Sequence, residues 1–93
     1  MKSWLNSDLP IIYRYRFYTS VTNSELNQWI EFDVPFSSSD DYLVIITPAS
    51  FPGAWTNVRY QVSEKLTNKA QFICYGENNY QGTGWFDIVV IGN

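Results

Sequence analysis

Hydrophobic and polar residues alternate strictly near the start of the chain. Between residues 11 and 18 the alternation has a period of two, which is typical of a half-buried β-strand. We expect one face of this strand to pack inward and the other to meet solvent or another molecule. The first face consists of Ile11, Tyr13, Tyr15 and Phe17, and the second of Ile12, Arg14, Arg16 and Tyr18.

Similar short runs recur up to the end of the sequence, separated by polar segments or by segments with Gly and Pro. They predict strands over residues 11–18, 29–36, 42–47, 58–65, 70–75 and 85–91. No segment has the 3.6-residue period of an amphipathic helix, although residues 24–27 in the polar stretch 19–27 could form one helical turn. The predicted fold is all-β, an antiparallel sandwich or a small barrel over residues 11–93 after an N-terminal arm of residues 1–10.

Two of the predicted strands specify which side chains should lie in the core. We expect the inward-facing residues to be Ile30, Phe32, Val34 and Phe36 in the second strand, and Val58, Tyr60 and Val62 in the fourth. Trp29, Glu31 and Asp33 should then point outward.

The strands over residues 42–47 and 85–91 are hydrophobic on both faces. Either they are central strands covered on both sides within one chain, or one face packs against another copy of the chain, since a large exposed apolar patch would lower solubility. Interleaved Tyr and Arg in the first strand favour an interface. The candidate interface residues are Tyr13, Tyr15, Val89 and Ile91.

Composition limits the chemistry that this chain of 93 residues can perform. It has no His and one Cys, which excludes Ser-His-Asp and Cys-His nucleophiles, His-containing zinc sites and an intrachain disulfide. The net charge of −3 and the scattered basic residues make nucleic acid an unfavourable partner. No apolar run reaches the ~20 residues of a membrane-spanning helix, so we expect no membrane insertion.

The order of segments from residue 29 onward resembles the H-type lectin-like domains, including those at the C-termini of bacteriophage tail fibres. The resemblance rests on residues 29–36, the acidic serine turn 37–41, the aliphatic strand 42–47 with Pro48 after it, the hairpin 65–72 and the hydrophobic end 86–92. It implies a six-stranded antiparallel β-sandwich, a homotrimer, and non-catalytic recognition of surface glycans at loops near a subunit boundary. The chain lacks the His and the paired Cys of the animal members, so the resemblance carries over the position of the site and not its ligand.

Two loops contain the residue types that bind sugars, which offer C–H faces to aromatic rings and hydroxyls to amides and carboxylates. Residues 51–57 carry Trp55 beside Asn57 and Arg59, although Phe51 and Trp55 could instead cap the open end of the fold. Residues 76–84 could equally be a solvated turn; their candidate ligand-binding side chains are Glu77, Asn78, Asn79 and Tyr80.

Three other features favour structural interpretations. Asp40 and Asp41 fit a solvated turn better than a metal site, because neighbouring strand residues point to opposite faces and no EF-hand spacing occurs. Cys74 lies in an apolar strand, where a buried, inert thiol is expected. Arg14 and Arg16 share one face of their strand and could hold a carboxylate, but an exposed face or an interface explains them more simply.

Taken together, the sequence predicts a non-enzymatic module without a cofactor or metal. The expected function is recognition of a bacterial surface carbohydrate or receptor by the trimeric tip domain of a phage tail fibre, with the virion as its location. The alternative is a small viral structural or protein-interaction domain, such as a virion decoration protein or an inhibitor of a host protein, that binds no sugar.

Overall fold

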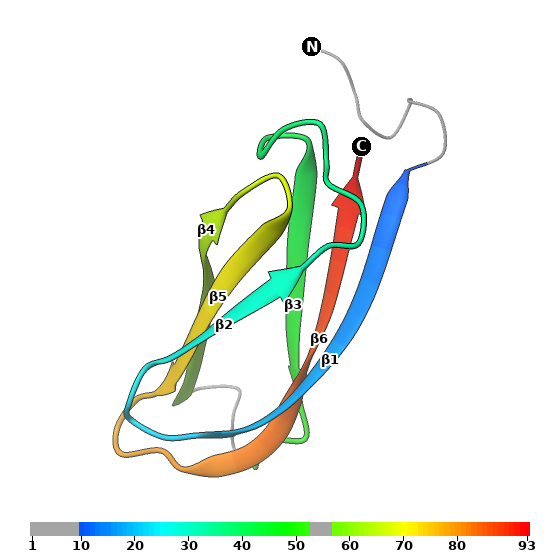
Figure 1. The fold of residues 1–93 in the computed structure, drawn as a ribbon. Coiled ribbons are helices and arrows are strands. Elements are labelled where there is room, and N and C mark those ends of the chain that lie inside the picture. Colours follow the sequence, from blue (N-terminus) through cyan, green and yellow to red (C-terminus); the bar gives the residue numbers. More distant parts are fainter. Residues whose placement is uncertain (1–9, 53–56) are drawn as a thin grey trace.

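The prediction of an all-β chain is confirmed. The computed structural model describes residues 10–52 and 57–93, which form two three-stranded antiparallel sheets with the strand orders β1-β6-β3 and β2-β5-β4 (Figure 1). The predicted arm, apart from Pro10, and Trp55 lie outside these residues. The strands are β1 (Ile11–Val21), β2 (Leu26–Glu31), β3 (Tyr42–Ala49), β4 (Val58–Lys65), β5 (Lys69–Gly76) and β6 (Gly82–Gly92).

The central strands of the two sheets, β5 and β6, supply the middle of a shared core. Every second side chain of each strand is buried, as their period of two requires. Phe72 on β5 and Phe86 on β6 meet across the core with ring centroids 5.6 Å apart, and Phe17 on β1 approaches Phe72 edge-on at 5.7 Å. Burial of these large rings stabilises the packing of one sheet on the other.

A second aromatic cluster fills the other end of the core. Tyr42 on β3 stacks on Phe36 at 4.5 Å and meets Phe32 edge-on at 5.2 Å. The Tyr42 hydroxyl donates a hydrogen bond to the carbonyl of Leu66 at 2.6 Å, and the Lys65 ammonium donates one to the carbonyl of Tyr42 at 2.6 Å. Polar links therefore join β3 of one sheet to the end of β4 and the following turn of the other.

The side between β1 and β2 is closed by tyrosine hydroxyls. No strand pairing joins β1 to β2, because they lie at the edges of different sheets. The hydroxyl of Tyr13 donates to the carbonyl of Val34 at 3.1 Å and accepts from the N–H of Val34 at 2.8 Å. The hydroxyl of Tyr15 donates to the carbonyl of Glu31 at 2.8 Å. Side chains thus pair backbone groups that would otherwise lack a partner at this seam.

The prediction for the second strand is partly wrong. Ile30, Phe32 and Phe36 are buried as expected, but β2 ends at Glu31 and Val34 is 55% exposed. The strand ends there, although the alternation continues in the sequence, because the backbone of Val34 bonds to the Tyr13 hydroxyl and to no neighbouring strand. Tyr60 lies on the inner side of β4 but stays 40% exposed, because β4 is an edge strand.

The polar stretch before β2 is shorter than predicted, and the expected helical turn does not form. β1 continues to Val21 by pairing with the start of β6, and β2 begins already at Leu26 by pairing with Cys74. Among the described residues no helix is long and apolar enough to cross a membrane.

Candidate functional site

A hollow on the outer face of the β2–β5–β4 sheet is the best candidate for a binding site. It encloses about 420 Å³, which lies within the range of small-ligand pockets. Five residues from β4, β5 and the β1–β2 loop line it, and we call it the loop-end hollow. They are Asn23, Glu25, Gln61, Ile73 and Tyr75.

Strand register places these residues together. Gln61 of β4 lies opposite Ile73 of β5, so their side chains point to the same outer face. Tyr75 is two residues beyond Ile73 and shares that face. The β1–β2 loop is held beside them, because the N–H of Gly76 donates to the carbonyl of Thr22 at 2.6 Å.

Residues of both predicted loops meet at the edge of the hollow. Arg59 lies opposite Tyr75 and forms an ion pair with Glu77 at 3.0 Å. The N–H of Glu77 donates to the carbonyl of Asn57 at 2.8 Å, and the Asn78 amide donates to the Asn57 side chain at 3.5 Å. The structure therefore brings Asn57, Arg59, Glu77 and Asn78 together, from segments about twenty residues apart in sequence.

In the loop over residues 76–84, Asn79 and Tyr80 are not part of this group. Asn79 is exposed, and both Asn78 and Asn79 have positive φ angles (57° and 59°), which Asn tolerates better than most residues. Tyr80 packs against the core, and its hydroxyl donates to the carbonyl of Pro52 at 2.7 Å. A Cβ atom added at Gly82 would collide with the Tyr80 hydroxyl, so the Tyr80 ring packs closely against Gly82. Tyr80 therefore supports the loop, and only part of its surface is exposed.

The hollow combines an amide, a carboxylate and an aromatic ring. Gln61 supplies the amide, Glu25 the carboxylate and Tyr75 a partly exposed ring with a hydroxyl, and none of the three forms a side-chain hydrogen bond with another described residue. These groups can donate to and accept from hydroxyls while the ring covers an apolar surface. Within the described part of the chain, no three His, Cys, Asp or Glu residues are placed to hold a metal ion.

The five lining residues were not predicted from the sequence. The alternation in residues 70–75 does indicate that Ile73 and Tyr75 share a face. However, which strands flank β5 is a long-range property, and without it the neighbourhood of Gln61 and of the β1–β2 loop is unknown.

Comparison of the chain with protein-family models, with curated proteins and with solved structures gives no match.

The outer face of the other sheet, β1-β6-β3, has a different character. At one end, three strands present a continuous set of aliphatic side chains, which we call the apolar face. Register places Ile12 and Leu43 on either side of Ile91, and Ile45 beside Val89. Ile12, Leu43 and Ile45 are 54%, 48% and 50% exposed. The apolar face consists of Ile12, Leu43, Ile45, Val89 and Ile91.

This arrangement excludes one of the two alternatives for residues 42–47 and corrects the expected set of interface residues. The strand over residues 42–47 is not covered on both sides, because β3 is an edge strand and no described segment packs on its outer face. The four candidate interface residues do not share a surface, since Val89 and Ile91 face outward while Tyr13 and Tyr15 pack toward the core and bond across the seam. The exposed aliphatic residues beside Val89 and Ile91 are Ile12, Leu43 and Ile45, not the two tyrosines.

Cys74 is buried, as predicted, and lies on the inner face of β5 with 1% of its surface exposed. Burial raises the pKa of its thiol to about 11. The thiolate, which is the reactive form, is thus disfavoured near neutral pH, and Cys74 is no candidate nucleophile.

Proposed function

We propose that this chain is a non-catalytic glycan-binding module and that the loop-end hollow is its sugar site. The observation that carries the proposal is the combination of an amide, a carboxylate and an aromatic ring in one hollow, none of them engaged with another described side chain. Sugars require this mixture, because a pyranose presents hydroxyls at its rim and C–H groups on its faces. The Arg59–Glu77 ion pair at the edge, 3.0 Å long, adds further oriented donors and acceptors.

We also propose that the module works as an assembly of identical copies. The apolar face gives a reason for contact, since Ile12, Leu43 and Ile45 are about half exposed and gain free energy when they leave water. A β-sandwich of the H-type lectin-like kind, assembled as a homotrimer at the tip of a phage tail fibre, is the specific form that we propose. It would act outside the cell, at the bacterial surface.

A glycan array, followed by titration of the best neutral ligand, tests the sugar site. Tyr75→Ala should weaken binding about tenfold, which corresponds to the ~1.4 kcal/mol that one aromatic contact can contribute. Gln61→Ala should weaken it too, through loss of a hydrogen bond. Trp29→Ala is the matched control, because Trp29 is another partly exposed aromatic residue on the same sheet and does not line the hollow.

Two results would count against the proposal: no glycan bound by the unaltered chain, or equal losses in the Tyr75 and Trp29 variants. The apolar face favours a second candidate function in that case. A virion decoration protein or an inhibitor of a host protein would use the same aliphatic residues to contact a different protein. No glycan on the array would then bind the chain.

A further inference from the structure

A row of charged and aromatic side chains crosses the outer face of the β1–β6–β3 sheet next to the apolar face. Register places Arg14 opposite Val89, Arg16 opposite Asp87 and Tyr18 opposite Trp85. All of these side chains project from the side of the sheet that faces away from the core. We call this set the arginine ledge: Arg14, Arg16, Tyr18, Trp85 and Asp87.

Arg16 is held in one orientation. Its Nε donates to one oxygen of Asp87 at 2.8 Å and its terminal nitrogen to the other at 3.3 Å, a bidentate pair. The guanidinium carbon also lies 4.9 Å from the centre of the Trp85 ring, a cation–π contact. Asp87 stays ionised, because its hydrogen bond with Arg16 lowers its pKa.

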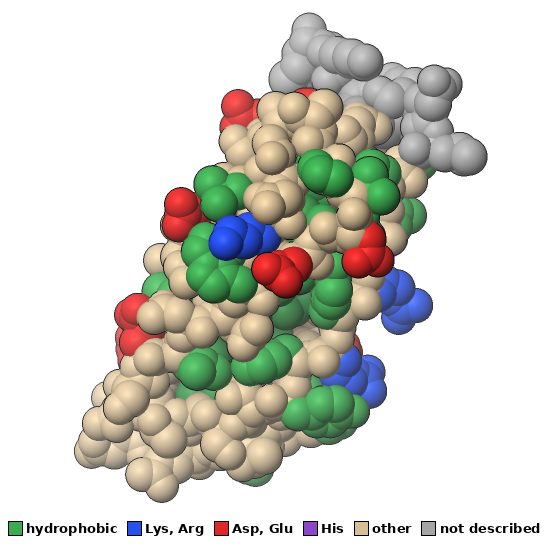
Figure 2. Space-filling view, in the orientation of Figure 1, with side chains coloured by type: hydrophobic (Ala, Val, Ile, Leu, Met, Phe, Trp, Pro, Cys, Tyr) green, Lys and Arg blue, Asp and Glu red, His purple; other side chains and the backbone are tan. Residues whose placement is uncertain are grey.

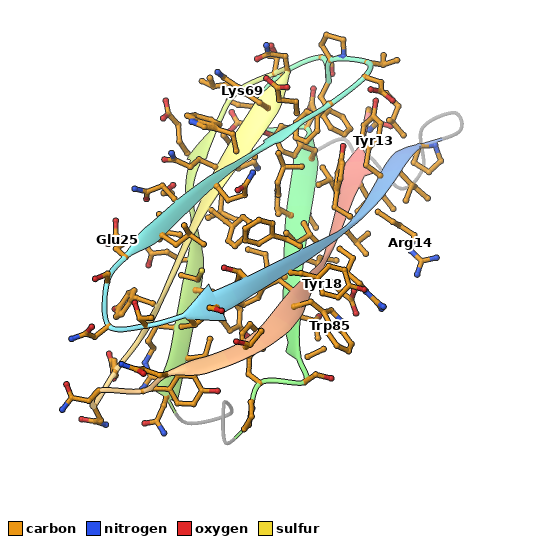
Figure 3. All side chains as sticks on the ribbon, turned by 60° about the horizontal axis from the view of Figure 1, so that its bottom comes forward. Tyr13, Arg14, Tyr18, Glu25, Lys69 and Trp85 are labelled. Carbon is orange, nitrogen blue, oxygen red and sulfur yellow. The ribbon has the colours of Figure 1, made fainter. Side chains whose placement is uncertain are left out.

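Trp85 in turn supports Tyr18. Their ring centroids are 5.6 Å apart, and Tyr18 is 66% exposed, the largest value among the exposed large hydrophobic residues of the described chain. Figure 3 shows Tyr18 beside Trp85, with Arg14 extending away from β1. The ledge thus ends in an aromatic surface that is open to solvent and rigid at its base.

Arg14 is the charged group of the ledge that has no fixed partner. It borders a hollow of about 320 Å³ together with Arg16, Asp87 and Val89, and it makes no hydrogen bond or ion pair with another described residue. Two arginines against one aspartate leave a local charge of +1 in a chain whose net charge is −3. In the orientation of Figure 2, basic side chains project along the edge where β1 lies, next to hydrophobic ones.

We propose that the arginine ledge is a second binding site, specific for an acidic oligosaccharide, that is, a glycan containing a sugar with a carboxylate. The carboxylate would bind Arg14, whose planar guanidinium can donate two parallel hydrogen bonds to it. An adjoining sugar ring would lie on Tyr18. Because Arg14 and Tyr18 are four residues apart, roughly 13 Å along the strand, the ligand must be longer than one ring.

The surroundings favour this ligand over other anions. A nucleic acid would need a broad basic surface to neutralise its phosphates, and the ledge has only one unpaired positive charge. An acidic peptide would satisfy Arg14 equally well but makes no particular use of an open aromatic face. A sugar uses both, because its C–H groups pack on the ring and its carboxylate pairs with the guanidinium.

The ledge and the loop-end hollow lie on the outer faces of different sheets, so the two sites can be tested separately. The probes are a trimer of galacturonic acid, a neutral galactose trimer and a glutamate trimer, each titrated calorimetrically into the full chain. Arg14→Gln removes the charge and keeps a polar amide on a shorter side chain, and Tyr18→Ala removes the ring. Lys69→Gln is the matched control, because Lys69 is a basic residue on the other sheet and lines neither hollow.

We expect the galacturonate trimer to bind the unaltered chain and the galactose trimer to bind the ledge at least tenfold more weakly. Arg14→Gln should weaken galacturonate binding roughly tenfold or more, as loss of a charged hydrogen bond requires. Tyr18→Ala should also weaken it, whereas Lys69→Gln should leave it unchanged. Raising the salt from about 0.05 to about 0.5 M should weaken galacturonate binding to the unaltered chain more than to the Arg14 variant.

Four outcomes would overturn the proposal. They are no galacturonate binding, binding unaffected by Arg14→Gln, an equal loss in the Lys69 variant, and equally tight binding of the glutamate trimer. If Arg14→Gln instead changed the mass of the assembly and left galacturonate binding intact, Arg14 would belong to a contact between copies.

Discussion

The two sheets of this protein are alike on their inner faces and unlike on their outer faces. Inside, each central strand buries three consecutive inward side chains almost completely, Ala70, Phe72 and Cys74 in one sheet and Phe86, Ile88 and Val90 in the other. Outside, the β2–β5–β4 sheet presents mainly amides and charges, whereas the β1–β6–β3 sheet presents the apolar face and the arginine ledge.

This difference shows which hydrophobic residues the fold requires and which it does not. One buried face per sheet suffices to form the core, because the outer side of the β2–β5–β4 sheet is polar and its strands are nevertheless complete. The aliphatic residues outside the β1–β6–β3 sheet are therefore not needed to fold one chain. Their contact with another molecule, proposed above, is what the second test below examines.

Substitutions on the inner faces of the sheets should have the largest effect on stability. Phe72→Ala and Phe86→Ala remove rings that are 1% and 0% exposed and that contact each other. Each should lower the free energy of unfolding by roughly 3–5 kcal/mol, through lost burial and the cavity left behind. Urea unfolding followed by tryptophan fluorescence measures this. A much smaller loss in one of the two variants would show that the sheets do not share the core equally.

The next prediction concerns the outer faces, where one residue is substituted on each sheet. Ile45→Glu places a charge in the apolar face and should convert the assembly to a monomer of 10.8 kDa with little loss of stability, since Ile45 is already 50% exposed. Asn27→Glu on the outer side of β2 is the control and should leave the mass unchanged. Light scattering coupled to size exclusion measures both. A monomeric unaltered chain would contradict the proposed assembly.

The smallest effect concerns the Arg16–Asp87 ion pair. The pKa of Asp87 is below its ordinary value of 3.8, chiefly because of its hydrogen bond with Arg16. A carboxyl whose pKa is lower in the folded state stabilises that state above the ordinary value and loses this contribution as the pH falls below it. Urea unfolding at several pH values near and below 3.8 should show a shallower fall in stability for Asp87→Asn.

The matched variant for this ion pair is Arg16→Gln. It should flatten the same part of the curve, and the double variant should add nothing more, because both substitutions remove one interaction. The effect should be small, since the side chains of Arg16 and Asp87 are 50% and 42% exposed. If the slope persists in Asp87→Asn, another carboxyl is responsible for it.

Most strand positions could be predicted from local alternation, because a period of two needs no knowledge of the partner strand. The predicted strand ends are less accurate where pairing with a distant strand determines them. Residues 19–21 are too polar to indicate a strand, yet they pair with the start of β6 some sixty residues later. Conversely, residues 32–36 keep the alternation but leave the sheet, because Tyr13 supplies the partner of Val34.

The candidate site could be predicted only at its edge. Polar and aromatic loop composition indicated Asn57, Arg59 and Glu77, and these residues do come together. The hollow itself combines β4, β5 and the β1–β2 loop, a grouping that depends on strand order. Similarly, alternation placed Arg14 and Arg16 on one face and suggested a carboxylate partner, but only the register identifies Asp87.

The seam between β1 and the segment after β2 has one further consequence. The amide hydrogen of Val34 is bonded only to the Tyr13 hydroxyl, a group carried by the opposite layer. Its exchange with deuterated solvent therefore requires the layers to part at this edge, whereas amides within a strand ladder exchange when that ladder opens. The exchange rate of the Val34 amide thus reports how often the two layers separate at this edge, independently of the opening of either sheet.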